Sequence, residues 1–423
     1  MVDDIRYPGL WSHYVAYMKA ALALIRKHEV EIGRRVKWET VLQLFEPLQK
    51  LPEFGNLHAF IASSPLADRV FVDDGGKPIG QAEAQSRWLM KYVMPILTRY
   101  VDREGAADYV HREGVLDFDE ARARAIYADL EASLECTEAV YSAVAPLQHF
   151  EGPDQEIRVD ATLVLRKLTQ LEKQLMWYVE EFGGRVDRSM EFCLAASIVA
   201  ERYAPVGLSA VRGPLMPGLT ALRLLKSGQV GVPAVMQYNL KPEFGPYGGF
   251  ERGTFGAPAA PGPGYTLLLE ESESLVGLYE ALAEAAPPNN LRVALRRFDY
   301  AYERTRPEDR LIDHWVALEA LFLPDISQEL SFRASLRIAY YVAGTPDERE
   351  EVFRKMRLSY DTRSDVVHGQ RLKADVNEVA SDTEEIVRRA LRAVVTNPGS
   401  LNVDRLDAAI ARGADPAQKR TLE

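Results

Sequence analysis

The sequence predicts a mainly α-helical protein that ends in a helical bundle, preceded by a helical N-terminal region and a small mixed α/β unit. Apolar residues recur at the 3.6-residue period of a helix near both ends of the chain, whereas alternating β-branched residues are confined to the middle. At 423 residues the chain is long enough for two or three domains. We therefore expect a mostly helical region over residues 1–135, a mixed α/β domain over 136–285 and a bundle over 287–413.

Helical spacing in the first region is clearest over residues 11–25 and 88–93. Residues 73–78 combine aspartate, glycine, lysine and proline, a composition typical of a turn. The chain starts with acidic rather than basic residues, and the apolar segment 14–25 is too short and too interrupted by Lys19 to cross a membrane. We therefore expect a protein without a targeting signal or membrane contact.

The middle region carries the strand signals. Residues 156–168 are β-branched and partly alternating, which predicts a strand. Thr169 and Glu172 then form a capping-box pattern, which predicts a helix over 171–181. The remaining elements expected here are a helix over 214–226 and short strands over 230–240 and 265–269.

Residues 241–265 are dense in glycine and proline, which predicts a long loop. The loop contains several aromatic residues and an arginine, namely Phe244, Tyr247, Phe250, Phe255 and Arg252. Flat aromatic and guanidinium faces suit the stacking of unpaired bases. A flexible or packed connector is the alternative, and both interpretations stay open.

The third region is expected to be helical throughout. Apolar stripes predict helices over about 291–302, 311–322, 332–340, 346–367, 377–395 and 404–411. The stripe expected for the third of these helices is Phe332, Leu336, Ala339 and Tyr340, and the fourth is expected to bury Val352, Met356, Tyr360 and Val367. Short loops make neighbouring helices antiparallel, which is typical of a bundle.

The fourth of these helices has start and stop signals of its own. Thr345 at the N-cap, Pro346 at the first helical position and Glu348 three residues after the cap predict its beginning. Gly369 predicts its end, because glycine readily adopts the left-handed conformation that follows many helices.

The charge, the cysteine count and the missing motifs exclude several classes of function. The formal charge of −11 means that the surface as a whole does not attract nucleic acid, so a nucleic-acid site needs a local basic patch. The two cysteines exclude a disulfide framework and a four-cysteine zinc site, and they fit a reducing, cytoplasmic compartment. No phosphate-binding loop, dinucleotide fingerprint, nucleophile elbow or H-E-x-x-H motif occurs, and the histidines lack metal-ligand spacing. We expect no metal and no cofactor.

The remaining candidate is the R-x4-H pattern formed by Arg363 and His368 late in the fourth helix of the bundle. On a helix these positions differ by about 500° of rotation and about 7.5 Å of rise, so the side chains diverge, although a long arginine can swing toward the same cleft. Histidine exchanges protons near neutral pH and arginine matches phosphate oxygens, so the pair suits RNA cleavage without a metal. Residues 349–373 hold seven Arg or Lys against four Asp or Glu. Alternatively, Arg363 pairs with a helix acid and His368 caps the helix.

Three blocks in order, LIDHWVALEALFLPD (311–325), ELSFRASLRIAYYVAG (329–344) and YDTRSDVVHG (360–369), resemble the Apea-like HEPN family. The resemblance covers about residues 287–413. It implies a HEPN-type bundle that acts as a metal-independent ribonuclease, as in toxin-type and anti-phage systems. It also implies homodimers in which two R-x4-H motifs face each other.

Carried over by position, Arg363 and His368 are the catalytic pair. Ser364 follows the arginine where the family often has Asn, Asp or His, and it still donates and accepts hydrogen bonds. Asp365 and Glu319 are candidate supporting residues; Glu319 either orients the arginine or is simply packed or solvated. Further basic residues expected to bind RNA are Arg357, Arg371 and Lys373.

Two functions from different classes follow. The first is a HEPN endoribonuclease, in anti-phage defence by abortive infection or in a toxin system, whose N-terminal region senses a phage or cellular trigger or restrains the nuclease. The second is a non-catalytic HEPN module that binds RNA, a nucleotide or a protein. Ser364 and the near-balanced charge of residues 290–413, 20 basic against 21 acidic, favour the second, whereas the intact pair favours the first. A helical scaffold without a ligand is a third option.

Overall fold

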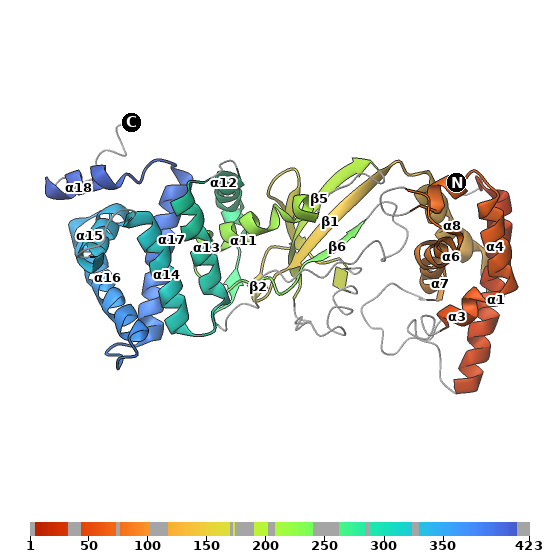
Figure 1. Cartoon of the computed structure of the whole chain (residues 1–423), viewed down its shortest axis with the longest axis horizontal. Helices are drawn as coiled ribbons and strands as arrows, with labels where there is room; N and C mark the ends of the chain where they lie inside the picture. Colours follow the sequence, from red (N-terminus) through yellow and green to blue (C-terminus); the bar gives the residue numbers. More distant parts are fainter. Residues whose placement is uncertain are drawn as a thin grey trace.

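A computed structural model describes residues 5–32, 44–72, 77–101, 117–169, 172–173, 190–201, 208–239, 262–283, 287–323 and 330–412. The protein is mainly helical and has a small antiparallel sheet. Figure 1 shows the N-terminal helices at one end, the sheet in the middle and the C-terminal helices at the other end.

The N-terminal helices have an apolar core of their own. They are α1 (Pro8–Ile32), α3 (Phe45–Gln49), α4 (Pro52–Ala62), α5 (Ala67–Val70), α6 (Gln81–Trp88), a π-helical turn η1 (Leu89–Val93), α7 (Met94–Val101) and α8 (Glu120–Glu135). Tyr14 packs against Trp88 and Tyr127, with ring centroids 6.3 and 5.5 Å away. The helices predicted at 11–25 and 88–93 are therefore confirmed, whereas most of the turn predicted at 73–78 lies outside the described residues.

Among the described residues the main sheet has five strands in the order β3-β4-β5-β1-β6, and all neighbours are antiparallel. Its strands are β1 (Glu138–Pro146), β3 (Ile157–Arg158), β4 (Leu163–Lys167), β5 (Phe192–Glu201) and β6 (Met236–Asn239), and a separate parallel pair joins β2 (Phe150–Glu151) to β7 (Tyr265–Thr266). Helices α10 (Leu208–Arg212) and α11 (Leu215–Leu225) pack on the sheet. Gly218 of α11 makes this packing close, because a Cβ there would approach Leu163 to 2.8 Å.

The single strand predicted at 156–168 is wrong, because this segment turns back on itself between β3 and β4. Asp160 accounts for the reversal. Its Oδ1 accepts hydrogen bonds from the backbone N–H groups of Thr162 and Leu163, both at 2.6 Å, which holds a tight turn.

Other predictions in the middle region have mixed outcomes. The capping box is confirmed: the Thr169 N–H donates to Glu172 Oε2 (2.7 Å) and the Glu172 N–H donates to Thr169 Oγ1 (3.2 Å). Only residues 172–173 of the helix predicted after it are described. The helix predicted at 214–226 is α11, the two short predicted strands shrink to β6 and β7, and most of the loop 241–265 lies outside the described residues.

Every helix predicted in the third region is confirmed. They are α13 (Asn289–Glu303), α14 (Pro307–Phe322), α15 (Leu330–Val342), α16 (Pro346–Val367), α17 (Val376–Thr396) and α18 (Val403–Ala411), and η2 (Leu269–Glu271) and α12 (Ser272–Ala283) precede them. Two details of the predicted stripes are wrong. On α15, Phe332 is 51% exposed and Arg337 is buried instead. On α16, Val367 at the end of the helix is 53% exposed.

The apolar core of the sheet continues into that of the C-terminal helices. Polar contacts reinforce this junction. Arg388 Nε donates to the Arg223 carbonyl (2.9 Å) and Arg392 Nη1 to the Leu225 carbonyl (3.1 Å), so two cations of α17 bind the C-terminal end of α11. The domain boundary near residue 285 stays a prediction, and packing is continuous across it.

Candidate functional site

The candidate site lies at the C-terminal end of α16, whose ends are fixed as the sequence predicts. Thr345 caps the first turn by accepting from the Glu348 N–H at 3.3 Å. At the other end the Gly369 N–H donates to the Val366 carbonyl (3.1 Å) and the Gln370 N–H donates to the Asp365 carbonyl (2.7 Å). This bonding pattern is a Schellman motif, which holds residues 366–370 in a defined conformation.

Gly369 has φ +65°, and no atom lies within 4 Å of the place where a Cβ would stand. Backbone strain is therefore the main cost of a side chain there, and we expect Gly369→Ala to lower the free energy of unfolding by about 1–2 kcal/mol. Urea denaturation measures this loss. Gly277→Ala in α12, where space is also open and φ is not positive, is the matched control and should not destabilise. Equal effects of the two variants would contradict the assignment of strain to Gly369.

Arg363 lies on the side of α16 that faces α14. Its Nη2 is 3.6 Å from Glu319 Oε1, and its guanidinium lies 5.8 Å from the centre of the Tyr360 ring. Burial raises the pKa of Glu319, and the positive charge of Arg363 acts against that rise. The Nε of Arg363 is buried and has no hydrogen-bond partner among the described residues. The arginine is thus positioned by Glu319 and Tyr360 and retains an unused donor.

His368 is the C-cap residue of α16 and is exposed to solvent. Its backbone N–H donates to the Ser364 carbonyl at 3.0 Å, which anchors the main chain and leaves the imidazole outside. No hydrogen bond joins Arg363 and His368 in this fully described helix. The structure therefore brings Arg363 and Glu319 together and leaves His368 apart from them, at the helix end.

The other predicted site residues lie around this helix end. Ser364 and Asp365 are half-buried, and their carbonyls accept the closing hydrogen bonds of the helix. Arg357 Nη1 donates to Ser331 Oγ at 2.9 Å, at the start of α15. Arg371 and Lys373 are exposed in the segment that follows α16.

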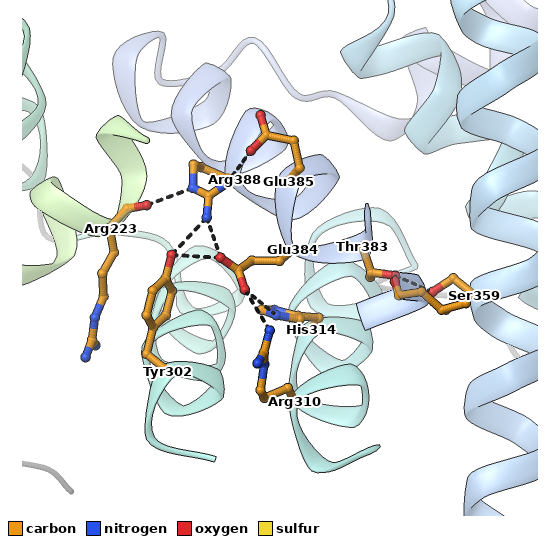
Figure 2. A network of polar contacts seen from close by, with 10 residues as sticks. Arg223, Tyr302, Arg310, His314, Ser359, Thr383, Glu384, Glu385 and Arg388 are labelled. Atoms are coloured by element: carbon orange, nitrogen blue, oxygen red, sulfur yellow. Dashed lines mark hydrogen bonds and ion pairs between the residues drawn. The ribbon is translucent and has the colours of Figure 1, made fainter. Parts of the chain in front are cut away.

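A second group of polar residues lies deep between α13, α14 and α17 (Figure 2). Arg388 Nη2 donates to the Tyr302 hydroxyl (2.9 Å), which donates to Glu384 Oε1 (3.1 Å). Arg310 Nη2 donates to Glu384 Oε2 at 3.4 Å, and His314 Nε2 lies 3.9 Å from the same oxygen. Burial lowers the pKa of His314 to about 4, with the nearby Glu384 acting against that shift.

This buried network is a poor place for catalysis because a substrate has no access to it. His314 is 0% exposed, and Arg388 and Tyr302 are each 1% exposed. We therefore regard it as a connection between helices. Sequence reasoning missed it; the local signal is the four-residue spacing of Glu384 and Arg388 inside the apolar stripe of α17.

Within the ranges that the structure covers, no three His, Cys, Asp or Glu side chains are grouped so that they would hold a metal ion. No helix in the same ranges is both long and apolar enough to span a membrane. Comparison with protein-family models, curated proteins and solved structures finds no match to this chain.

Proposed function

We propose that the protein is an endoribonuclease that cleaves RNA without a metal ion, with Arg363 and His368 as its catalytic pair. The observation that carries the proposal is the exposed imidazole of His368 at the end of α16, about one and a half turns from Arg363, a partly exposed arginine that is paired with Glu319. An exposed imidazole is accessible to a polymer, and a guanidinium fixed by a carboxylate can be aimed at phosphate. The resemblance to Apea-like HEPN domains supports the same assignment.

In this mechanism His368 moves the proton of a 2′-hydroxyl or of the leaving group. The 2′-oxygen attacks the adjacent phosphorus, the bond to the 5′-oxygen breaks, and that oxygen gains a proton. Arg363 stabilises the additional negative charge on the phosphoryl oxygens in the transition state. The products are a 2′,3′-cyclic phosphate and a 5′-hydroxyl, and no group outside the chain is needed.

Arg363 variants test the role of the charge. We expect Arg363→Ala to weaken RNA binding and to slow single-turnover cleavage by about a hundredfold or more, because it removes a donor aimed at the developing charge. Arg363→Lys should restore binding better than rate, since an ammonium keeps the charge and loses the forked geometry. Cleavage is measured with EDTA present. Full activity of Arg363→Ala would rule out this role.

Arg296→Ala is the matched control, because Arg296 is an exposed arginine on α13, in the same group of helices. It should leave both the rate and the affinity unchanged.

One arginine–histidine pair with diverging side chains is a poor phosphate clamp, whereas two pairs related by a twofold axis would surround a phosphate. We therefore expect a homodimer through the C-terminal helices, with the same surface of each subunit at the interface. Light scattering at micromolar concentration should give twice the chain mass of 47.5 kDa. A monomer that retains full cleavage activity would contradict the dimer.

The N-terminal helices fit the role of a sensor or restraint, because their core is separate from the core beside the catalytic pair. In this proposal the enzyme acts in the cytoplasm, in anti-phage or toxin-type defence, and a phage or cellular trigger acts through these helices.

One observation favours a second function. Arg363 already has Glu319 as a partner, and Ser364 follows it, so the pair also fits a non-catalytic module that binds RNA, a nucleotide or a protein. Total RNA incubated with EDTA separates the two functions. Cleavage by the wild type that is lost in His368→Ala supports the nuclease, and identical fragment patterns support the binding module.

A further inference from the structure

The first turn of α15 exposes a large aromatic side chain beside α16. Phe332 is 51% exposed, and its ring meets that of Phe353 edge to face, with centroids 5.7 Å apart and planes at 81°. The ring of Phe332 is thus held against a half-buried neighbour, while about half of its surface remains exposed to solvent. A fixed aromatic face is what an unpaired base uses for stacking.

Two arginines lie near this aromatic pair. The Arg357 guanidinium is held by Ser331 Oγ, a neutral partner, and no carboxylate among the described residues forms an ion pair with it. Arg354 follows Phe353 on α16 and is exposed. An aromatic ring next to a fixed arginine matches a nucleotide, with its flat base and its anionic phosphate.

Phe353 of the aromatic pair and the candidate catalytic histidine lie along one face of α16. Phe353, Arg357, Ser364 and His368 are spaced by four, seven and four residues, a spacing that places them on the same side of a helix. Asp361 lies four residues after Arg357, on nearly the same side of the helix, whereas Asp365 is offset from that side. About 16 Å of helix separates Arg357 from His368, a distance that an extended single strand can follow.

We propose that this face of α16, together with Phe332, binds unpaired RNA, with one base stacked on Phe332 and a phosphate held by Arg357, on the way to His368. The inference rests on the proposed ribonuclease function and adds to it the class of substrate: a single strand, whose bases are free to stack, rather than a duplex. In this proposal Phe332 binds the RNA and takes no part in its cleavage.

The test measures fluorescence anisotropy of a labelled single-stranded oligoribonucleotide and of a blunt duplex of the same sequence. The protein is the full chain carrying His368→Ala, so that cleavage does not consume the probe. We expect Phe332→Ala to weaken binding of the single strand by about five- to a hundredfold and to leave the weaker duplex binding unchanged. Phe332→Tyr should retain binding, because the ring is kept.

Salt dependence separates stacking from charge. Arg357→Ala should lower the slope of log affinity against log salt by about 0.7, the value for one phosphate contact on a single strand, whereas Phe332→Ala should leave that slope unchanged. Tyr300→Ala is the matched control, because Tyr300 is an aromatic residue on α13 that is 40% exposed. It should bind like the parent.

Three results would overturn the inference: equal effects of Phe332→Ala and Tyr300→Ala, duplex binding as tight as single-strand binding, or a change from dimer to monomer in Phe332→Ala. The last of these would show that a second copy of the chain covers the face. If the wild type cleaves RNA while Phe332→Ala changes nothing, only this inference fails. If the wild type neither binds nor cleaves RNA, the proposed function fails with it.

Discussion

Replacing His368 by alanine is expected to lower the single-turnover rate of RNA cleavage by at least about a hundredfold, the usual scale for a general acid or base. RNA affinity should stay nearly unchanged, because a neutral imidazole contributes little to binding a polyanion. His368 is exposed, so alanine leaves no buried cavity there, and the main-chain bonds of the helix end remain.

The rate is measured in single turnover with EDTA, and the affinity by anisotropy under the same conditions. His28→Ala on α1 is the control for loss of a histidine elsewhere, and it should cleave like the wild type. If His368→Ala lost its helical signal by circular dichroism, His368 would be a helix cap and the catalytic assignment would fall. An unchanged rate would have the same consequence.

A second large effect is expected from Arg223→Met. Arg223 is 1% exposed, donates to Asp299 Oδ1 at 2.9 Å and to the Val230 carbonyl at 3.1 Å, and lies over the Tyr302 ring at 4.6 Å. Removing it leaves the Asp299 carboxylate buried without its counter-charge. Loss of one partner of a buried ion pair typically lowers the free energy of unfolding by about 3–5 kcal/mol, and urea denaturation measures the change.

The effect should depend on pH in a defined direction. Burial raises the pKa of Asp299, and Arg223 acts against that rise, so the pKa in Arg223→Met is higher still. Between about pH 4 and this raised pKa, the Asp299 carboxyl is protonated in the folded variant and ionised in the unfolded chain. The destabilisation is therefore largest near neutral pH and shrinks as the pH falls toward 4.

Two further variants check the cause of this effect. Arg223→Met combined with Asp299→Asn should recover much of the stability, because no charge is then buried. Arg296→Met, which removes an exposed arginine from α13, should have little effect. A pH-independent loss would contradict the electrostatic cause.

The helices of the C-terminal region could be predicted because their signals are local. Apolar stripes, the Thr345 cap and the Gly369 stop all act within a few residues of the elements they define. The long strands β1 and β5 were not predicted. Both are rich in alanine and small residues and lack clear alternation, and what makes them strands is their pairing with each other over nine positions.

The predicted buried face of α15 shows why part of the packing could not be derived. Counting apolar residues places Phe332 inside, yet the structure buries Arg337 instead. Arg337 Nη1 donates to the Phe322 carbonyl at 2.6 Å, and its Nε donates to Asp407 Oδ1 at 2.7 Å, a residue 70 positions away. No local pattern reveals a partner so distant in sequence. The roles of Arg363 and His368 likewise stay predictions, since their positions alone do not establish chemistry.

The separate core of the N-terminal helices has a thermodynamic consequence. Cooperative unfolding follows continuous packing, and among the described residues the two apolar cores are separate, with Cys136 and Thr137 connecting α8 to β1. We therefore expect two cooperative units, with Trp88 in the core of the first and Trp315 in the core of the second. A single melting temperature would not describe such a protein, and we expect the first unit to open and close while the second stays folded.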